Sequence, residues 1–229
     1  MTARSMLDKI CILIPAYNAQ ETLGSVLKKI EILKIDTIVV YDGSSDGTKK
    51  VASEIGVHFL RHPFNLGKGA ALQTGFQYAL QRGYEVIITL DADGQHDPSE
   101  IPSLLRIFQS VSPDILIASR AAEFGKMTFL RRFWNRLGMR AVARLCHRDI
   151  TDSQSGFRLI RAEVIREIHL SASRFEMELE LLIRACKKGF SVLSVPINTQ
   201  SVDGTGSSHF RPVVDTWLVC RVFLRNLFW

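Results

Sequence analysis

The stretch Val86-Ile-Ile-Thr-Leu-Asp91-Ala-Asp93-Gly-Gln95-His96-Asp97 runs an apolar segment directly into two carboxylates one residue apart. Residues 86–90 are apolar and rich in β-branched side chains, which predicts a strand buried on both faces. Residues 97–100, Asp-Pro-Ser-Glu, predict an N-cap, a proline at the first helical position and a capping-box glutamate. Asp91 and Asp93 are therefore expected on a strand-to-helix turn, where open α/β sheets bind their ligands.

The oxygen-rich side chains on this turn indicate a metal site. Asp91, Asp93 and Gln95 offer hard ligands that suit Mg²⁺ or Mn²⁺. Two carboxylates at this spacing also occur in ordinary polar loops beside a helix cap, so the motif alone leaves both interpretations open.

Strands and helices alternate on both sides of this turn. The expected strands are residues 10–14, 37–40, 57–60, 86–90 and 115–118. The expected helices are residues 23–32, 46–55, 69–81 and 98–109. This β-α repetition predicts an α/β fold with a doubly wound, largely parallel sheet flanked by helices, its loops gathered at one edge. Beyond Ser119 we expect an amphipathic basic segment, a strand near Phe157, an acidic helix, a short strand and an apolar tail.

Length and composition limit the class of protein. The chain has 229 residues, 46% of them hydrophobic, which is enough for one substantial domain but cramped for two. Its four cysteines are far apart and form no C-x-x-C pair, as is typical of buried thiols in a reducing compartment. No apolar stretch approaches the roughly 20 residues of a spanning helix, and the N-terminus lacks a signal-peptide core. We expect a cytoplasmic protein, or one peripheral to the cytoplasmic face of a membrane, and not a secreted one.

The excess positive charge is concentrated in one segment. The net charge is +6, and residues 126–148 contain seven Lys or Arg but no Asp or Glu. Five arginines from Arg132 to Arg148 recur every four residues beside an apolar face, which predicts a basic amphipathic helix on an anionic membrane surface. The tail, residues 213–229, combines aromatic residues with two arginines and suits the same interface. The alternative is that both helices pack on the sheet with their arginines in water.

Two further loops carry polar and aromatic side chains but no phosphate-binding motif. Tyr17 and Glu21 follow the first strand, and Asp42 follows the second. Neither loop has the glycine pattern of a dinucleotide fold or a P-loop. These groups suit a base and ribose, with Asp42 accepting from a base N–H, although Asp-Gly-Ser-Ser-Asp-Gly is also an ordinary turn sequence. Lys68, near a predicted helix N-terminus, is either a phosphate or sugar contact or a solvated lysine.

Five motifs occur in order over residues 10–200. They are Pro15-Ala-Tyr-Asn, Val40-Tyr-Asp-Gly-Ser-Ser-Asp-Gly-Thr48, Asn65-Leu-Gly-Lys-Gly69, Leu90-Asp-Ala-Asp-Gly-Gln-His96 and Asp152-Ser-Gln-Ser-Gly-Phe-Arg158. Together they resemble the motifs of family 2 glycosyltransferases, in particular the dolichyl- and polyprenyl-phosphate sugar synthases. The resemblance implies a single GT-A domain over residues 1–212, a UDP- or GDP-sugar donor, a divalent metal and inversion at the anomeric carbon. Nothing in the motifs indicates a nucleic-acid partner or an oligomeric state.

The resemblance also assigns roles to individual residues. The nucleoside pocket would be lined by Pro15, Tyr17, Glu21 and Asp42. The metal would be held by Asp91, Asp93 and Gln95. The donor phosphates would meet Lys68, Arg120, Arg131 or Arg132, His209 and Arg211. Catalysis would depend on Asp93, Arg120, Asp152 and Glu178. Tyr41 stands where the family often has a first aspartate, which leaves the base, uracil or guanine, open.

The acceptor depends on whether the site contains a catalytic base. A sugar hydroxyl loses a proton as it attacks and needs a carboxylate within reach, whereas a lipid phosphate is already an anion near neutral pH. The candidate carboxylates are Asp152 and Glu178. Glu178 lies in the run Arg174-Phe-Glu-Met-Glu-Leu-Glu, where we expect it to face the cleft. A solvated helical face is the other interpretation for Glu176 and Glu180.

We expect transfer of a hexose to a polyprenyl phosphate, with three alternatives open. The first is a family 2 enzyme that uses a saccharide hydroxyl in glycan synthesis. The second is a phosphatase of the haloacid dehalogenase type with Asp91 as nucleophile, although Gln95 stands where threonine is expected. The third is a non-catalytic protein that binds a nucleotide sugar.

Overall fold

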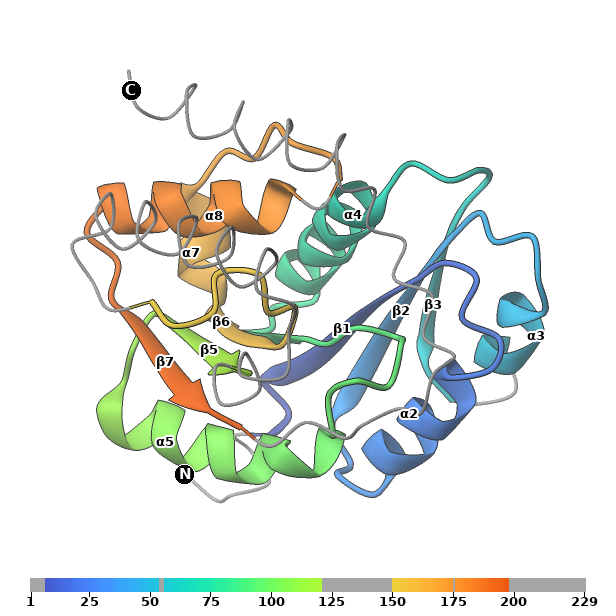
Figure 1. Cartoon of the computed structure of the whole chain (residues 1–229), viewed down its shortest axis with the longest axis horizontal. Coiled ribbons are helices and arrows are strands. Elements are labelled where there is room, and N and C mark those ends of the chain that lie inside the picture. Colours follow the sequence, from blue (N-terminus) through green and yellow to red (C-terminus); the bar gives the residue numbers. More distant parts are fainter. Residues whose placement is uncertain (1–6, 54–55, 121–149, 175, 198–229) are drawn as a thin grey trace, which may run out of the picture.

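The computed structural model describes residues 7–53, 56–120, 150–174 and 176–197 (Figure 1). Within these residues strands and helices alternate along the first half of the chain, as predicted. The strands are β1 (Ile10–Ala16), β2 (Asp36–Asp42), β3 (His58–His62), β4 (Val86–Thr89), β5 (Ile115–Ser119), β6 (Arg158–Arg161) and β7 (Val192–Pro196). The helices are α2 (Leu23–Glu31), α3 (Thr48–Ser53), α4 (Lys68–Gln81), the 3₁₀ turn η1 (Pro98–Glu100), α5 (Ile101–Val111), α7 (Ala162–Glu167) and α8 (Glu176–Lys187).

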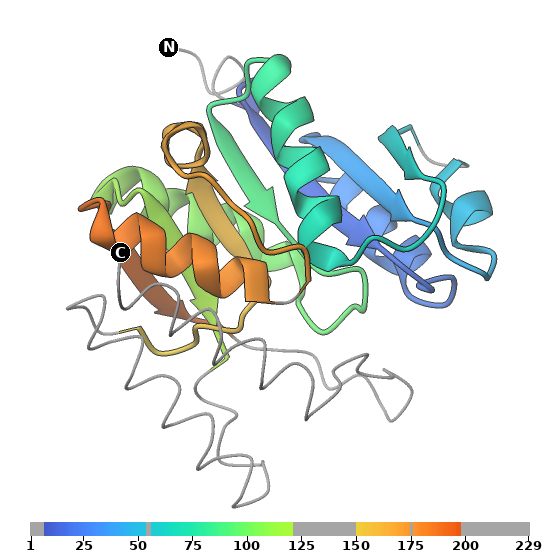
Figure 2. The same cartoon turned by 90° about the horizontal axis from the view of Figure 1, so that it is seen from above.

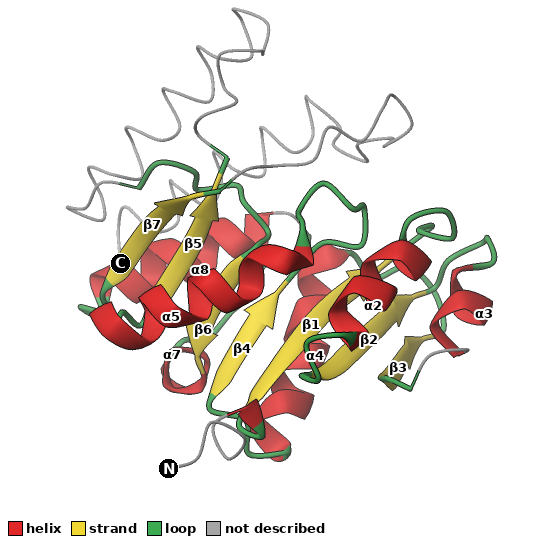
Figure 3. Cartoon of the chain, turned by 90° about the horizontal axis from the view of Figure 1, so that it is seen from below, coloured by secondary structure: helices red, strands yellow, loops and turns green. Residues whose placement is uncertain are grey.

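The seven strands of the described residues form one sheet in the order β3-β2-β1-β4-β6-β5-β7. Neighbouring pairs are parallel except at β6, which runs antiparallel to both β4 and β5. The prediction of a largely parallel sheet flanked by helices is confirmed. Because β6 is reversed, its first residue lies at the edge where the parallel strands end (Figure 3).

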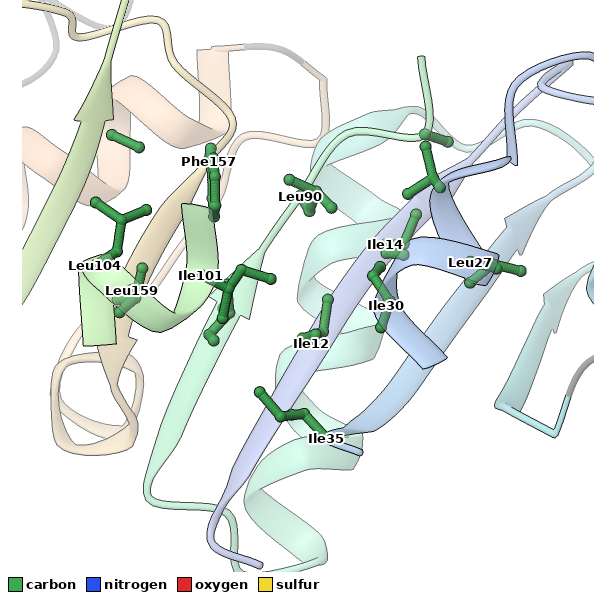
Figure 4. Close-up of a cluster of buried hydrophobic side chains, with 14 of the residues drawn as sticks. Ile12, Ile14, Leu27, Ile30, Ile35, Leu90, Ile101, Leu104, Phe157 and Leu159 are labelled. Atoms are coloured by element: carbon green, nitrogen blue, oxygen red, sulfur yellow. The ribbon is translucent and has the colours of Figure 1, made fainter. Parts of the chain in front are cut away.

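Alternation along β1 assigns one set of side chains to each face of the sheet. Ile12 and Ile14 face the cluster that contains the buried residues of α2 and α5 (Figures 3 and 4). Cys11 and Leu13 face the cluster formed with α4, α7 and α8 (Figure 2). Both faces are covered by helices, which explains why β1 is apolar at every position.

Helix α2 shows how the sequence builds one of these layers. Its buried residues, Leu23, Val26, Leu27 and Ile30, recur at spacings of three and four and so form one stripe. This stripe faces Ile12 and Ile14, and complete burial of such a side chain contributes about 1.5–3 kcal/mol.

The structure extends the predicted elements and adds one. Strands β2 and β3 continue to Asp42 and His62, because these polar residues still pair across the sheet. The Asp97 side chain accepts from the Ser99 amide at 3.1 Å, so this N-cap is confirmed, although the first turn is 3₁₀. Helix α7 was not predicted, because only three of its six residues are buried.

Several predictions lie outside the described residues. These are the basic segment 126–148, the domain boundary at residue 212 and the helix over residues 213–229. Among the residues that are described, no helix is long and apolar enough to cross a membrane.

Candidate active site

The predicted site residues meet at one edge of the sheet. Tyr17 and Asp91 follow the strands β1 and β4, and Asp42 is the last residue of β2. The carboxyl ends of these three parallel strands point the same way (Figure 3). Arg120 follows β5, and Asp152 precedes the reversed strand β6, so both reach the same edge. The fold therefore gathers side chains that are more than 130 residues apart in the sequence.

Lys68 joins two of the predicted carboxylates at this edge. Its Nζ lies 2.7 Å from Oδ1 of Asp91 and 2.8 Å from Oε2 of Glu178. Lys68 is the first residue of α4, and Glu178 lies in the first turn of α8. The prediction that Glu178 faces the site agrees with this contact, and Lys68 is one of its partners rather than a solvated side chain.

Charge and burial act in opposition in this cluster. Burial lowers the pKa of Lys68, but the charges of Asp91 and Glu178 outweigh it and hold the pKa above its ordinary value. Burial likewise raises the pKa of Asp91, but Lys68 keeps it below its usual range. For Asp93, burial and the charge of Asp91 together raise the pKa. The charges of Lys68 and Arg120 offset this shift only in part, so negative charge is in excess at Asp93 among the described residues.

Gly156 lets the Asp91 carboxylate lie against the backbone of the neighbouring loop. A Cβ at position 156 would meet Oδ2 of Asp91 at 2.3 Å, well inside van der Waals contact. The Gly156 carbonyl accepts from Oγ1 of Thr89 at 2.8 Å, which ties this loop to the end of β4. The glycine in the fifth motif is therefore required for close approach to the Asp91 side chain.

The turn at residues 91–95 fits a hard divalent cation. Gly94 has φ +74°, which bends the chain, and Oδ1 of Asp93 accepts from the Gln95 amide at 3.0 Å. Asp91, Asp93 and Gln95 supply carboxylate and amide oxygens, and a cation would offset the excess charge at Asp93. No group of three or more His, Cys, Asp or Glu in the described part of the chain is arranged for a metal. In the predicted site, Gln95 would be the third side-chain ligand beside Asp91 and Asp93.

The half-buried Arg120 and the buried Asp152 form an ion pair. The backbone amide and Nε of Arg120 both donate to Oδ2 of Asp152 at 3.1 Å, and the Gln154 amide donates to Oδ1. Nη1 of Arg120 lies 3.5 Å from Oε1 of Gln95. Asp152 is only 2% exposed, so its carboxylate orients Arg120 and has both oxygens engaged.

Asp42 has contacts within the protein that the sequence did not indicate. Its carboxylate accepts from the amides of Leu66 and Gly67 at 2.9 and 2.8 Å and contacts Nδ1 of His62 at 2.7 Å. Nε2 of His62 lies 2.9 Å from Oγ1 of Thr74. Asp42 is 2% exposed, so it shapes the loop after β3, and its contacts are with the protein's own groups. Its role toward a base stays a prediction.

The end of β1 and the loop after it carry three of the residues predicted to contact the nucleoside. Tyr17 is 37% exposed, Pro15 is half-buried and Glu21 is exposed. Asn18, at φ +48°, accepts from the Ser45 amide at 2.9 Å, which fixes this loop to the one after β2. The two loops are held together, with Tyr17 at their surface.

The interpretation of Glu176 and Glu180 as a solvated helical face, which the sequence left open, is excluded because both side chains are buried. Glu180 accepts from the amides of Ser171 and Ala172 at 2.9 and 2.8 Å and pairs with Arg184 at 2.8 Å. These partners come from a loop before α8 and from the next turn of the helix, and neither shows in the spacing of the acidic run. Oε2 of Glu176 has no hydrogen-bond partner within the described residues.

Two buried residues beside the site were quoted in motifs but given no role. His96 packs edge-on against Phe157 at 5.5 Å between ring centroids, and burial lowers its pKa to about 4. Arg158 is the other, and its contacts are described below. A charged residue after Gly-Phe carries no sign of burial in the sequence itself. The remaining predicted residues, Arg131, Arg132, His209 and Arg211, lie outside the described residues.

Comparison with known families places the chain in a class. The family described as glycosyl transferase family 2 matches residues 11–169, and the chain belongs to this family. It is therefore a glycosyltransferase, and the predicted resemblance is confirmed.

Two characterised relatives share most of the chain. Polyprenol monophosphomannose synthase of Mycolicibacterium smegmatis is 35% identical over 206 residues, which cover 83% of this chain and 77% of that protein. Undecaprenyl-phosphate mannosyltransferase of Micrococcus luteus is 31% identical over 202 residues, which cover 82% of each. These similarities support the polyprenyl-phosphate branch of the family.

The fold is also found in solved structures. Glucosyl-3-phosphoglycerate synthase of M. tuberculosis superposes with a TM-score of 0.71 at 19% identity, over 99% of this chain and 85% of that one. At this identity the likeness concerns the fold, which is of the GT-A type.

Proposed function

We propose that this glycosyltransferase moves a hexose, with inversion, from a UDP- or GDP-sugar to a polyprenyl phosphate. The observation that carries the proposal is the state of the two carboxylates predicted as bases. Asp152 is paired with Arg120, and Glu178 is paired with Lys68. Both side chains are buried.

A buried and paired carboxylate is poorly suited to take a proton from a hydroxyl. Protonation of Asp152 would leave Arg120 without its paired carboxylate, and protonation of Glu178 would remove one of the two carboxylates that compensate the buried Lys68; both changes are costly. A phosphate monoester has its second pKa near 6 and is an anionic nucleophile at neutral pH without a base. The ion pairs therefore favour a phosphate acceptor over a sugar hydroxyl.

The names of the two relatives agree with this choice of acceptor. One is a polyprenol monophosphomannose synthase and the other an undecaprenyl-phosphate mannosyltransferase. The motifs shared with this branch extend through Asp152 to Arg158, the segment that holds Arg120.

Binding of Mg²⁺ or Mn²⁺ by Asp91, Asp93 and Gln95 belongs to the same proposal. A bound cation would stabilise the negative charge that develops on the leaving diphosphate. Arg120, oriented through Nε by Asp152, would add its terminal nitrogens to the same phosphates. Tyr17, at the surface of the loop after β1, would provide an aromatic face for the base.

One observation favours a second candidate, transfer to a saccharide hydroxyl. Glu176 is buried in the first turn of α8, and its Oε2 has no hydrogen-bond partner among the described residues. Such a carboxylate is available as a base if the acceptor reaches it. Membership in the glycosyltransferase family argues against the phosphatase alternative, in which Asp91 would have been the nucleophile.

The test is a transfer assay on the purified protein with undecaprenyl phosphate. A panel of UDP- and GDP-sugars is supplied with Mg²⁺ or Mn²⁺, and lipid-linked sugar is measured by mass spectrometry. We expect product with one nucleotide class, with an inverted anomeric centre, and loss of product in EDTA that returns when the metal is restored. Absence of lipid-linked sugar with every donor would contradict the proposal.

A lipid acceptor also requires contact with a membrane, and the basic segment 126–148 is the proposed contact. We expect the protein to float with anionic vesicles at low salt and to release as salt screens the charges. Reversal of charge at Arg136 and Arg140 should abolish flotation. Flotation of the variant at the wild-type level would exclude this segment as the contact.

A further inference from the structure

Arg158 is among the largest fully buried side chains of the described residues, at 1% exposure. It is the first residue of β6, the reversed strand between β4 and β5. A buried arginine is costly unless its donors are satisfied, so its partners indicate what it does.

Each nitrogen of the guanidinium group donates to a different backbone carbonyl. Nε donates to Ser155 at 2.8 Å, Nη2 to Ser153 at 2.8 Å and Nη1 to Glu178 at 2.7 Å. The first two carbonyls belong to the loop before β6, and the third belongs to the first turn of α8. Arg158 therefore joins two segments that are more than 20 residues apart in the chain.

These two segments carry both ion pairs of the site. The loop before β6 contains Asp152, which holds Arg120. The first turn of α8 contains Glu178, which holds Lys68 against Asp91. The position of one pair relative to the other thus depends on the distance that the rigid guanidinium fork maintains between the two backbones.

Arg158 is itself fixed to β4, the strand that leads to the turn at residues 91–95. It lies opposite Thr89 in the antiparallel pairing of β4 and β6, and Oγ1 of Thr89 donates to the Gly156 carbonyl. Burial lowers the pKa of Arg158, while the charges of Glu178, Asp152 and Asp91 act against that shift. The Arg158 guanidinium thus lies among the acidic groups of the site and compensates part of their charge.

Arg161, at the other end of the same four-residue strand, is a natural contrast. It donates to the Pro113 carbonyl and to Oγ of Ser112. Its contacts lie at the opposite edge of the sheet and are partly exposed, so it has no link to the site.

We propose that Arg158 is a positioning residue, which aligns the Arg120–Asp152 pair with the Lys68–Glu178–Asp91 cluster by holding the loop at 152–156 against α8. The proposal rests on the proposed function in giving these pairs a role in transfer. It involves no contact between Arg158 and substrate.

The test compares Arg158→Lys with the control Arg161→Lys. Lysine keeps the charge but presents its donors from one nitrogen, so it cannot reach three separated carbonyls in a plane. Hydrogen exchange of the ligand-free proteins should be faster in Arg158→Lys at residues 152–156 and 176–180, by roughly tenfold, and unchanged in α2. In Arg161→Lys both regions should exchange as in the wild type.

Steady-state kinetics provide a readout that a purely structural role would not give. With the donor that the wild type turns over, kcat of Arg158→Lys should fall roughly 10- to 100-fold, because misalignment affects the reacting groups. KM for the donor should stay within about twofold, because the proposed contacts with the base and ribose are at the loops after β1 and β2. Arg161→Lys should keep both constants.

Wild-type exchange and kcat in Arg158→Lys would overturn the proposal. Faster exchange throughout the chain would overturn it as well, as would failure of both Arg158→Lys and Arg158→Gln to fold, since Arg158 would then support the whole core. Exchange is measured without substrate, so it decides the role of Arg158 even if the wild type transfers no sugar to polyprenyl phosphate. A wild type that transfers no sugar to polyprenyl phosphate would contradict the proposed function instead.

Discussion

The carboxylates at the ends of β2 and β4 lie at the same edge of the sheet but have opposite environments. Asp42 accepts from two backbone amides and contacts His62, and these partners cannot leave without unfolding the loop after β3. Asp91 is held by the end of one flexible side chain, Lys68, and lies against the backbone of Gly156. The first carboxylate is part of the framework, whereas the second can exchange its partner.

This difference separates residues that shape the site from residues that act in it. The backbone amides of Leu66 and Gly67 fix the Asp42 side chain as part of the folded loop. Lys68 supplies Asp91 with a positive charge that a divalent cation would replace in the proposed metal site. Burial and the charge of Asp91 raise the pKa of Asp93, which indicates that the negative charge there is not fully compensated. Loss of Asp42 should therefore affect stability first, and loss of Asp91 should affect transfer first.

The largest expected effect is that of Asp91→Asn on transfer. We expect kcat to fall by about 10³-fold, equivalent to about 4 kcal/mol of transition-state stabilisation. The melting temperature should change little, because the main partner of this side chain is the terminal amine of Lys68. Glu85→Gln, which removes an exposed partner of Lys9, is the control and should retain full activity. Near-normal turnover of Asp91→Asn at saturating Mn²⁺ would refute the metal assignment.

Asp42→Ala should reverse that order of effects. The change leaves two amides and the His62 ring without their acceptor, which should lower the free energy of unfolding by about 2–4 kcal/mol. Urea denaturation of the purified variant measures this directly. The control is Asp46→Ala, an exposed carboxylate that also accepts from two amides and should cost about 1 kcal/mol. Equal losses in the two variants would remove the distinction drawn for Asp42.

Gly156→Ala should have the smallest of the three effects and act only through Asp91. The added Cβ would meet Oδ2 of Asp91 at 2.3 Å, so the carboxylate must rotate away from it. We expect a 10- to 100-fold loss of kcat, or about 1.4–2.7 kcal/mol, with the fold retained. Gly56→Ala is matched, because a Cβ there meets nothing within 4 Å. Equal activity of the two variants would show that the Asp91 position is not critical.

Much of the frame was predictable because it depends on local pattern. The apolar run before Asp91 and the stripe of α2 each follow from periodicity within one element. The direction of β6 was not predictable, because its four residues carry no pattern that distinguishes a parallel from an antiparallel strand. The motifs singled out Asp91, Asp152 and Glu178, which lie at one edge of the sheet in the structure, and their roles stay predictions.

The partners of those residues were not predictable from spacing. Glu180 is buried because a loop before α8 turns back to donate two amides to it, and Asp42 is saturated by a loop 24 residues later. Arg158 takes its role from carbonyls on two segments. Such contacts depend on how the chain returns to the site, which no single motif encodes.

The most direct test of the central claim compares two acceptors that differ only in the phosphate. Purified protein, the preferred nucleotide sugar and metal are incubated with undecaprenyl phosphate or with undecaprenol in the same detergent, and lipid-linked sugar is quantified. The paired states of Asp152 and Glu178 predict rapid transfer to the phosphate and none to the alcohol. Transfer to undecaprenol at a comparable rate would contradict the account, because the site would then contain a working base.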